Sequence, residues 1–171
     1  MTETATAPIG AAPPIGAAPP IGFGPHEIDT AAPTRDVPLK WVVVVDETLP
    51  PGRAVNAAVC VAGATVDRVP GLLGPAVDDA DGSAHPGLPW LGCTVLGAAP
   101  EQLAAVRARA AAREDVALVD MPTQAQHTRV YDDYLFAVGR TPSAQLGYHA
   151  VSLVGPRRVV DRLTKGLRLL P

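Results

Sequence analysis

The sequence contains few features that would place it outside the class of reduced, soluble proteins. Only two cysteines occur, Cys60 and Cys93, and their spacing fits neither a C-x-x-C motif nor a set of zinc ligands. We expect both to be reduced and buried as small hydrophobic residues. No basic segment followed by an apolar stretch opens the chain, and the longest apolar run, around residues 41–45, is far shorter than the roughly 20 residues that span a bilayer. These absences predict a cytoplasmic protein with no membrane partner.

Several catalytic signatures are also missing. The chain has no G-x-G-x-x-G, no Walker loop, no G-x-S-x-G and no H-E-x-x-H, which removes several common classes of enzyme. The acidic loop with Asp78, Asp79 and Asp81 lacks the later glutamate and the ligand order of a calcium loop. We therefore predict no metal and no cofactor.

The net charge of −3 is unevenly distributed. Residues 1–38 carry four acidic residues and one arginine, so residues 39–171 hold 13 residues of each sign and are formally neutral. A neutral domain lacks the broad basic field of a general nucleic-acid binder, which disfavours tRNA as a partner. Five cations near the C-terminus oppose only Asp161, and they form either a solvated face, which we prefer, or a phosphate contact: Arg157, Arg158, Arg162, Lys165 and Arg168.

Residues 1–38 form a Pro/Gly/Ala-rich segment built on a repeat. Ala-Pro-Ile-Gly is followed by two copies of Ala-Ala-Pro-Pro-Ile-Gly that end at Gly22. Pro-Pro pairs exclude helix and central strand, and so little apolar surface does not offset the entropy of ordering. We predict a disordered tail. The regular spacing of Ile9, Ile15 and Ile21 indicates either a weak docking motif or, as we prefer, replication slippage.

Residues 39–171 alternate strand and helix patterns. Four consecutive valines after Trp41 are typical of a strand buried on both faces, and the alanine-rich face of residues 53–66 predicts a helix packed closely on a sheet. Other strands are expected over 90–96, 115–120, 147–154 and, at an edge, 167–170; other helices are expected over 100–113, 125–138 and 156–166. The third helix would bury Val130, Tyr134, Leu135 and Val138, with Tyr131 and Tyr134 on the sheet. This alternation predicts one layered α/β domain.

Asp120 ends a predicted strand and is followed by Thr123 and Gln126, at the place where open α/β sheets bind ligands. Asp120 can orient or activate water, Thr123 can donate to an oxyanion, and Arg53 can clamp a carboxylate or phosphate. A structural alternative stays open. Thr123 and Gln126 spell a capping box, and Asp120 before a helix favours the helix dipole.

Two further polar residues are candidates for binding. Asn56 lies one turn after Arg53 and either contacts a ligand or ties down the loop after Asp46. His85 is surrounded by acidic residues in the loop over 78–87. His127 and His149 are interpreted as helix-surface and strand residues.

Three segments carry a resemblance to known families. They are residues 46–58 (DETLPPGRAVNAA), 119–126 (VDMPTQAQ) and 155–167 (GPRRVVDRLTKGL). Nearly all of residues 39–171 resembles an uncharacterised bacterial group, the domain of unknown function 2000 family, which is itself similar to type II peptidyl-tRNA hydrolases. The resemblance implies a compact mixed sheet of about four strands flanked by helices, and a site where the first strand, its following helix and the Asp120 segment converge.

By position, Arg53 stands where the hydrolases use a lysine, Asp120 where they use an aspartate, and Gln126 near their glutamine. The resemblance implies hydrolysis of a peptidyl- or aminoacyl-type ester, with Asp120 and Arg53 as catalytic residues. With the polar residues singled out above, the expected substrate-binding set is Asn56, Thr123, Gln126, Asp46 and His85. Arginine is not interchangeable with lysine, so a non-catalytic module that binds a small carboxylate or phosphate is the alternative. Interaction through the tail is a third hypothesis, and homodimerisation is left open.

Overall fold

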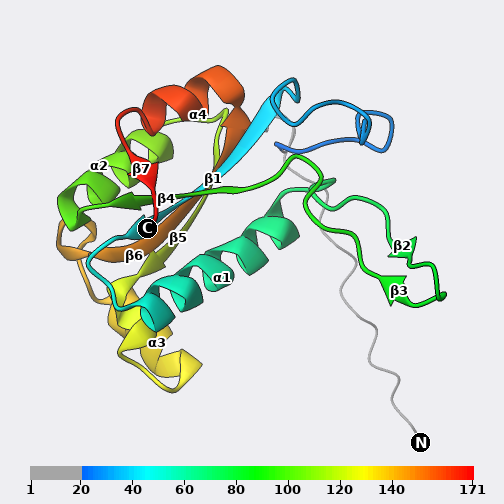
Figure 1. Cartoon of the computed structure of the whole chain (residues 1–171). Helices are drawn as coiled ribbons and strands as arrows, with labels where there is room; N and C mark the ends of the chain where they lie inside the picture. Colours follow the sequence, from blue (N-terminus) through cyan, green and yellow to red (C-terminus); the bar gives the residue numbers. More distant parts are fainter. Residues whose placement is uncertain (1–20) are drawn as a thin grey trace, which may run out of the picture.

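The computed structural model describes residues 21–171, which fold around a five-stranded mixed sheet (Figure 1). The strands lie in the order β5-β6-β1-β4-β7, so β5 forms one edge. β1 runs parallel to β4, while β6 is antiparallel to both β1 and β5, and β7 is antiparallel to β4. Their bounds are β1 Leu39–Asp46, β4 Thr94–Ala98, β5 Ala117–Pro122, β6 Tyr148–Pro156 and β7 Arg168–Leu169. The α/β prediction is confirmed, and the predicted edge strand supplies the fifth strand.

Three helices cover the two faces of this sheet: α1 (Pro51–Arg68) lies on one face, and α2 (Pro100–Ala111) and α4 (Arg157–Leu163) lie on the other. A further helix, α3 (Tyr131–Gly139), follows β5. The valines of β1 alternate between two cores, because successive side chains of a strand point to opposite faces. Val43 and Val45 pack with the buried face of α1, and Val42 and Val44 pack with α2 and α4. The prediction of a central strand buried on both faces is confirmed. No helix in the described part of the chain is long and apolar enough to cross a membrane.

A buried polar chain fixes α1 against the sheet. The indole Nε1 of Trp41 donates to Ser152 Oγ at 2.8 Å, and Thr65 Oγ1 lies 2.7 Å from the same oxygen. Thr65 also donates to the carbonyl of Val61 within α1, at 2.6 Å. Since buried polar groups are costly without partners, these bonds hold the helix at one position over β1 and β6.

The predicted helix over 125–138 is wrong in its extent. Residues Thr123–Gln126 form a 3-10 turn, η1, and α3 begins only at Tyr131. No residue of α3 is buried, and Val130 and Leu135 are 56% and 53% exposed, because the helix projects beyond the edge of the sheet instead of lying on it (Figure 1). Tyr131 and Tyr134 contact each other, with ring centroids 5.4 Å apart.

Two other expectations differ from the structure. Cys60 and Cys93 are both exposed rather than buried: Cys60 lies on a solvent-accessible part of α1, and Cys93 lies in the loop before β4. The acidic loop over 78–87 contains a short hairpin, β2 (Val77–Asp78) with β3 (Ala84–His85), which stands apart from the main sheet (Figure 1).

The described part of the predicted tail packs against the domain. Phe23 is 5% exposed, its amide donates to the carbonyl of Pro70 at 3.0 Å, and its ring lies 4.9 Å from that of Trp90. Gly71 has a φ of +75°, and a Cβ there would lie 2.6 Å from the carbonyl oxygen of Phe23. Packed structure therefore begins before residue 39, whereas the repeats around Ile9 and Ile15 lie outside the described residues.

Candidate functional site

Gln126 joins the first helix to the segment after β5. Its Oε1 accepts a hydrogen bond from Arg53 Nε at 2.8 Å, and its Nε2 donates to the carbonyl of Arg53 at 2.9 Å and to Asn56 Oδ1 at 3.0 Å. The structure thus brings together three of the predicted site residues, with Gln126 lying 73 and 70 positions after Arg53 and Asn56 in the chain. The capping-box interpretation is wrong: η1 has no side-chain cap, because the Gln126 amide binds Arg53 and Asn56 of α1 instead.

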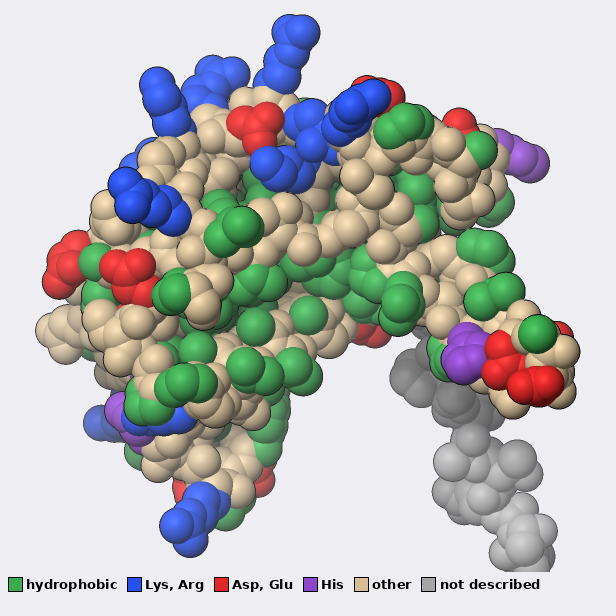
Figure 2. Space-filling model, in the orientation of Figure 1, with side chains coloured by type: hydrophobic (Ala, Val, Ile, Leu, Met, Phe, Trp, Pro, Cys, Tyr) green, Lys and Arg blue, Asp and Glu red, His purple; other side chains and the backbone are tan. Residues whose placement is uncertain are grey.

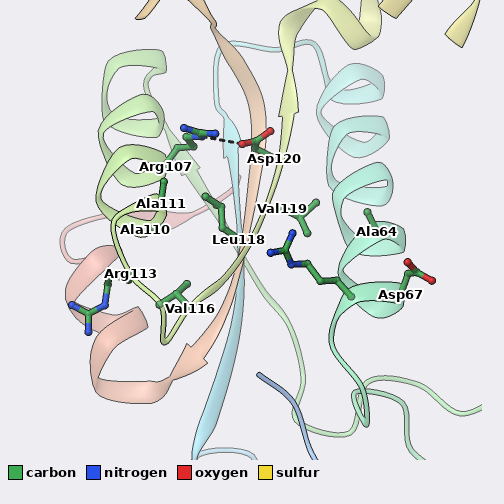
Figure 3. A pocket seen from close by; sticks show the side chains of 11 residues that line it. Ala64, Asp67, Arg107, Ala110, Ala111, Arg113, Val116, Leu118, Val119 and Asp120 are labelled. Carbon is green, nitrogen blue, oxygen red and sulfur yellow. Dashed lines mark hydrogen bonds and ion pairs between the residues drawn. The ribbon is translucent and has the colours of Figure 1, made fainter. Parts of the chain in front are cut away.

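Asp120 points to the opposite face of the sheet from this network. Its Oδ2 accepts a hydrogen bond from Arg107 Nε of α2 at 2.9 Å (Figure 3). The Arg107 guanidinium also lies 5.2 Å from the centre of the Tyr148 ring. Leu118 lies on the same side, while Val119 and Met121 pack toward α1. Asp120 and Arg53 therefore do not form one catalytic pair, because successive side chains of β5 point to opposite faces of the sheet and Asp120 points away from Arg53.

A groove between α1 and α3 nevertheless borders residues from both groups. Its cavity volume is about 520 Å³, and β5 forms its floor. It is lined by Asn56, Cys60, Val61 and Ala64 of α1, Val119, Asp120 and Met121 of β5, and Ala125, Thr128, Arg129, Val130, Tyr131 and Tyr134 of the following segment. We call this the α1–α3 groove. Asn56 and Asp120 are the predicted site residues that line it, while Gln126, which is itself bound to Arg53, holds Asn56 from outside the groove.

Of the two charged side chains that line the α1–α3 groove, only Asp120 has an ion-pair partner within residues 21–171. Asp120 is bound by Arg107, whereas Arg129 has no hydrogen-bond or ion-pair partner within residues 21–171. Burial, together with the nearby Tyr131 and Asp120, raises the pKa of the Tyr134 phenol, so this hydroxyl is a neutral donor at physiological pH. The groove therefore combines an apolar floor with neutral donors and one unpaired cation.

The remaining predicted binding residues lie elsewhere. Asp46 is buried at the end of β1, and its Oδ1 accepts from the amide and the hydroxyl of Thr48 at 2.9 and 2.7 Å, which fixes the turn into α1. The amide of Thr123 donates to the carbonyl of Gly147 at 3.0 Å. Both contacts are structural.

His85 lies on the separate β2–β3 hairpin, with Nε2 3.4 Å from Asp79 Oδ2. Hydrogen bonds from the backbone of Ser83 and from His85 lower the pKa of the exposed Asp79 carboxyl. Within the described residues, no group of three or more His, Cys, Asp or Glu side chains could hold a metal ion. His85 is therefore not brought to the groove.

His149 is a buried residue that sequence reasoning interpreted only as a strand position. It is 6% exposed, and neither ring nitrogen has a hydrogen-bond partner in the described part of the chain. The register between β5 and β6 shifts here, since Met121 pairs with Ala150 and Pro122 with Tyr148. Such an irregularity changes the direction in which a side chain points, and no pattern in the sequence predicts it. His149 lies with its ring centre 6.2 Å from that of His127.

Comparison with known proteins places the chain in a structural context. The family model described as "Protein of unknown function (DUF2000)" matches residues 39–171. A solved structure of a protein of unknown function from Agrobacterium tumefaciens strain C58 is similar, with a TM-score of 0.72 and 18% sequence identity. The similarity covers 77% of this chain and 97% of that one, and at this identity it shows the fold alone. No curated protein matches significantly.

Proposed function

The chain belongs to the family described as "Protein of unknown function (DUF2000)", and we propose that it binds a small ligand with a carboxylate or phosphate group in the α1–α3 groove. The observation that carries this proposal is the unpaired Arg129 at a groove whose single lining carboxylate, Asp120, is already bound by Arg107. An anionic group gains a charge-assisted hydrogen bond there without displacing an existing partner.

The shape of the groove supports a ligand that also carries an apolar part. Val61, Val119, Met121 and Ala125 supply an apolar lining, and the side chains of Asn56, Thr128 and Tyr134 add a few polar contacts. Small-molecule sites typically combine a largely apolar concave surface with a few convergent polar groups. The network from Gln126 to Asn56 holds the Asn56 amide in place before a ligand arrives, which lowers the ordering cost of binding.

The Arg129→Gln variant tests this assignment. We expect phenyl phosphate, phenylacetate or N-acetyl-leucine to raise the melting temperature of the wild-type chain in a thermal-shift series. Loss of the charge-assisted bond is expected to weaken the affinity by about 10- to 100-fold, measured by calorimetry. Arg140→Gln is the matched control, because Arg140 also lies in this segment but does not line the groove. Failure of all three compounds to stabilise the wild type, or equal binding by both variants, would contradict the proposal.

Ester hydrolysis on a type II peptidyl-tRNA hydrolase-like scaffold is the second candidate function. It is favoured by Asp120 and Asn56, a carboxylate and an amide that border the same groove. Arg107 occupies Oδ2 of Asp120, and the other oxygen has no partner within residues 21–171, so it can accept a proton from water. Because Arg107 already holds Oδ2, only one oxygen of this carboxylate is left for a water molecule, which ranks hydrolysis second.

Turnover of an N-acetyl-aminoacyl ester distinguishes the two functions. If Asp120 is a general base, Asp120→Asn is expected to lower kcat by roughly 100-fold or more while the fold is kept. Circular dichroism at matched concentrations checks the fold. Absence of turnover in the wild type, or equal turnover in the variant, would leave ligand binding as the function of the groove.

A further inference from the structure

A second depression follows the free edge of β5. Its cavity volume is about 720 Å³, and it extends from α1 on one face of the sheet to α2 on the other (Figure 3). Leu118, Val119 and Asp120 of β5 line it, together with Val116 just before the strand. Its walls are Ala64, Asp67 and Arg68 of α1 on one side, and Arg107, Ala110 and Ala111 of α2 with the following Arg113 on the other. We call it the β5 trough.

Backbone N–H and C=O groups of β5 are free to pair with another strand at the base of the β5 trough. β5 pairs with β6 on one side, and among the described residues no strand lies on its other side. Every second residue of an antiparallel strand directs its N–H and C=O away from its partner. An edge of this kind is a template for another strand.

The walls of the trough leave room for a single extended chain. Ala64, Ala110 and Ala111 present only methyl groups to it from the two helices. Figure 3 shows β5 running between α1 and α2, with these small side chains on either side of it. A peptide lying along residues 116–120 would pair with the free edge of β5, and at about 3.3 Å per residue it would be only a few residues long.

The charges along the trough favour an acidic peptide. Arg107 is bound to Asp120, and Arg113 is bound through two hydrogen bonds to Asp115. Arg68 has no hydrogen-bond or ion-pair partner within residues 21–171, and Asp67 is drawn on the side of α1 turned away from β5 (Figure 3). A carboxylate of an incoming strand therefore has an unpaired arginine available.

We propose that the β5 trough binds an extended, acidic segment of a partner protein, which adds a strand to the edge of β5. The pairing of main-chain groups would supply affinity, and alternate side chains would supply specificity. The N-terminal repeats of the chain itself are a poor match, because Pro8, Pro13, Pro14, Pro19 and Pro20 have no N–H to donate. A second copy of the chain would bring its own α1 and α2 against the same walls.

Selection of peptides on the full-length chain tests this proposal. A displayed library of random heptapeptides is selected on the wild type, and the dissociation constant of the best acidic peptide is measured by fluorescence anisotropy. Two N-methylated versions of that peptide are compared with it. One is methylated at the odd-numbered residues and the other at the even-numbered residues, so only one of them lacks the N–H groups that face β5. One of the two is expected to bind about 10-fold or more weakly, because it loses main-chain hydrogen bonds.

Variants of the chain locate the bound peptide. Ala111→Tyr fills the trough at the exposed end of α2 and is expected to weaken binding by about 10-fold or more, whereas Ala108→Tyr, on the same helix but not lining the trough, leaves it unchanged. Arg68→Gln is expected to weaken binding by about 3- to 10-fold. Arg129→Gln leaves peptide binding unchanged, because Arg129 lines only the α1–α3 groove, so the two proposals fail separately.

Several outcomes would overturn strand addition. They are a selection that yields no acidic binder, a binder that tolerates N-methylation in both registers, and a binder that ignores Ala111→Tyr. A dimer of the chain in analytical ultracentrifugation that Ala111→Tyr dissociates would instead assign the trough to a second copy.

Discussion

The Leu153→Ala variant is expected to lower the free energy of unfolding by about 2–5 kcal/mol, the range for truncating a fully buried leucine. Leu153 is 0% exposed in the middle of β6. It pairs with Val42 of β1 on one side and with Leu118 of β5 on the other, and it packs in the core under α2 and α4. Truncation removes apolar contacts and leaves a cavity where three strands and two helices meet, so the surroundings have little freedom to collapse.

Urea unfolding followed by circular dichroism measures this effect. Leu169→Ala is the matched control, because Leu169 is 70% exposed on the edge strand β7 and its loss is expected to cost no more than about 0.5 kcal/mol. A difference of less than 1 kcal/mol between the two variants would contradict the interior position of β6 between β5 and β1, and with it the strand order that makes β5 an edge.

The His149→Leu variant is expected to raise the free energy of unfolding by about 1–3 kcal/mol at neutral pH. Both ring nitrogens of His149 are buried without a partner, and each has lost its hydrogen bonds to water. An apolar side chain of similar size removes that desolvation cost while it keeps the packing. A loss of stability instead would indicate that His149 has a polar partner in solution.

The same residue gives stability a dependence on pH. Burial lowers the pKa of His149, and the positive Arg53 lowers it further, against a smaller opposing effect of Asp46. The unfolded state therefore binds a proton at a higher pH than the folded state, so stability falls as the pH drops below about 6.5 and until it reaches the lowered folded pKa. Each unit of difference between the two pKa values is worth about 1.4 kcal/mol.

Unfolding at pH 7.5 and 5.5 tests this dependence. The wild type is expected to lose more stability between the two values than His149→Leu does, because the variant has no buried imidazole to protonate. His26→Leu, at an exposed histidine that makes no hydrogen bond or ion pair within residues 21–171, is the control and is expected to keep the wild-type slope. Equal slopes for the wild type and His149→Leu would assign the pH dependence to another group.

The α1–α3 groove illustrates how far the sequence alone reaches toward a site. Asp120 and Asn56 could be named in advance, because one ends a strand and the other follows Arg53 by one helical turn. Arg129 could not be named, because it lies in a connection whose path is set by the break between η1 and α3. Arg107 was missed as well, since only the packing of α2 on the sheet brings it to Asp120.

Local pattern determined β1, α1 and α2 from the sequence. Four consecutive valines in β1 indicate a strand that is buried on both faces. The small residues of α1 and the apolar residues of α2 recur at helical spacing. These patterns involve residues close together in the chain, so they can be read from the sequence. The tertiary structure alone decided that Gln126 binds α1, that Asp120 faces α2 and not Arg53, that a register shift buries His149, and that α3 stays exposed. These outcomes depend on which sheet face and which partner each side chain meets, and those are set by strand order and register between segments far apart in the chain.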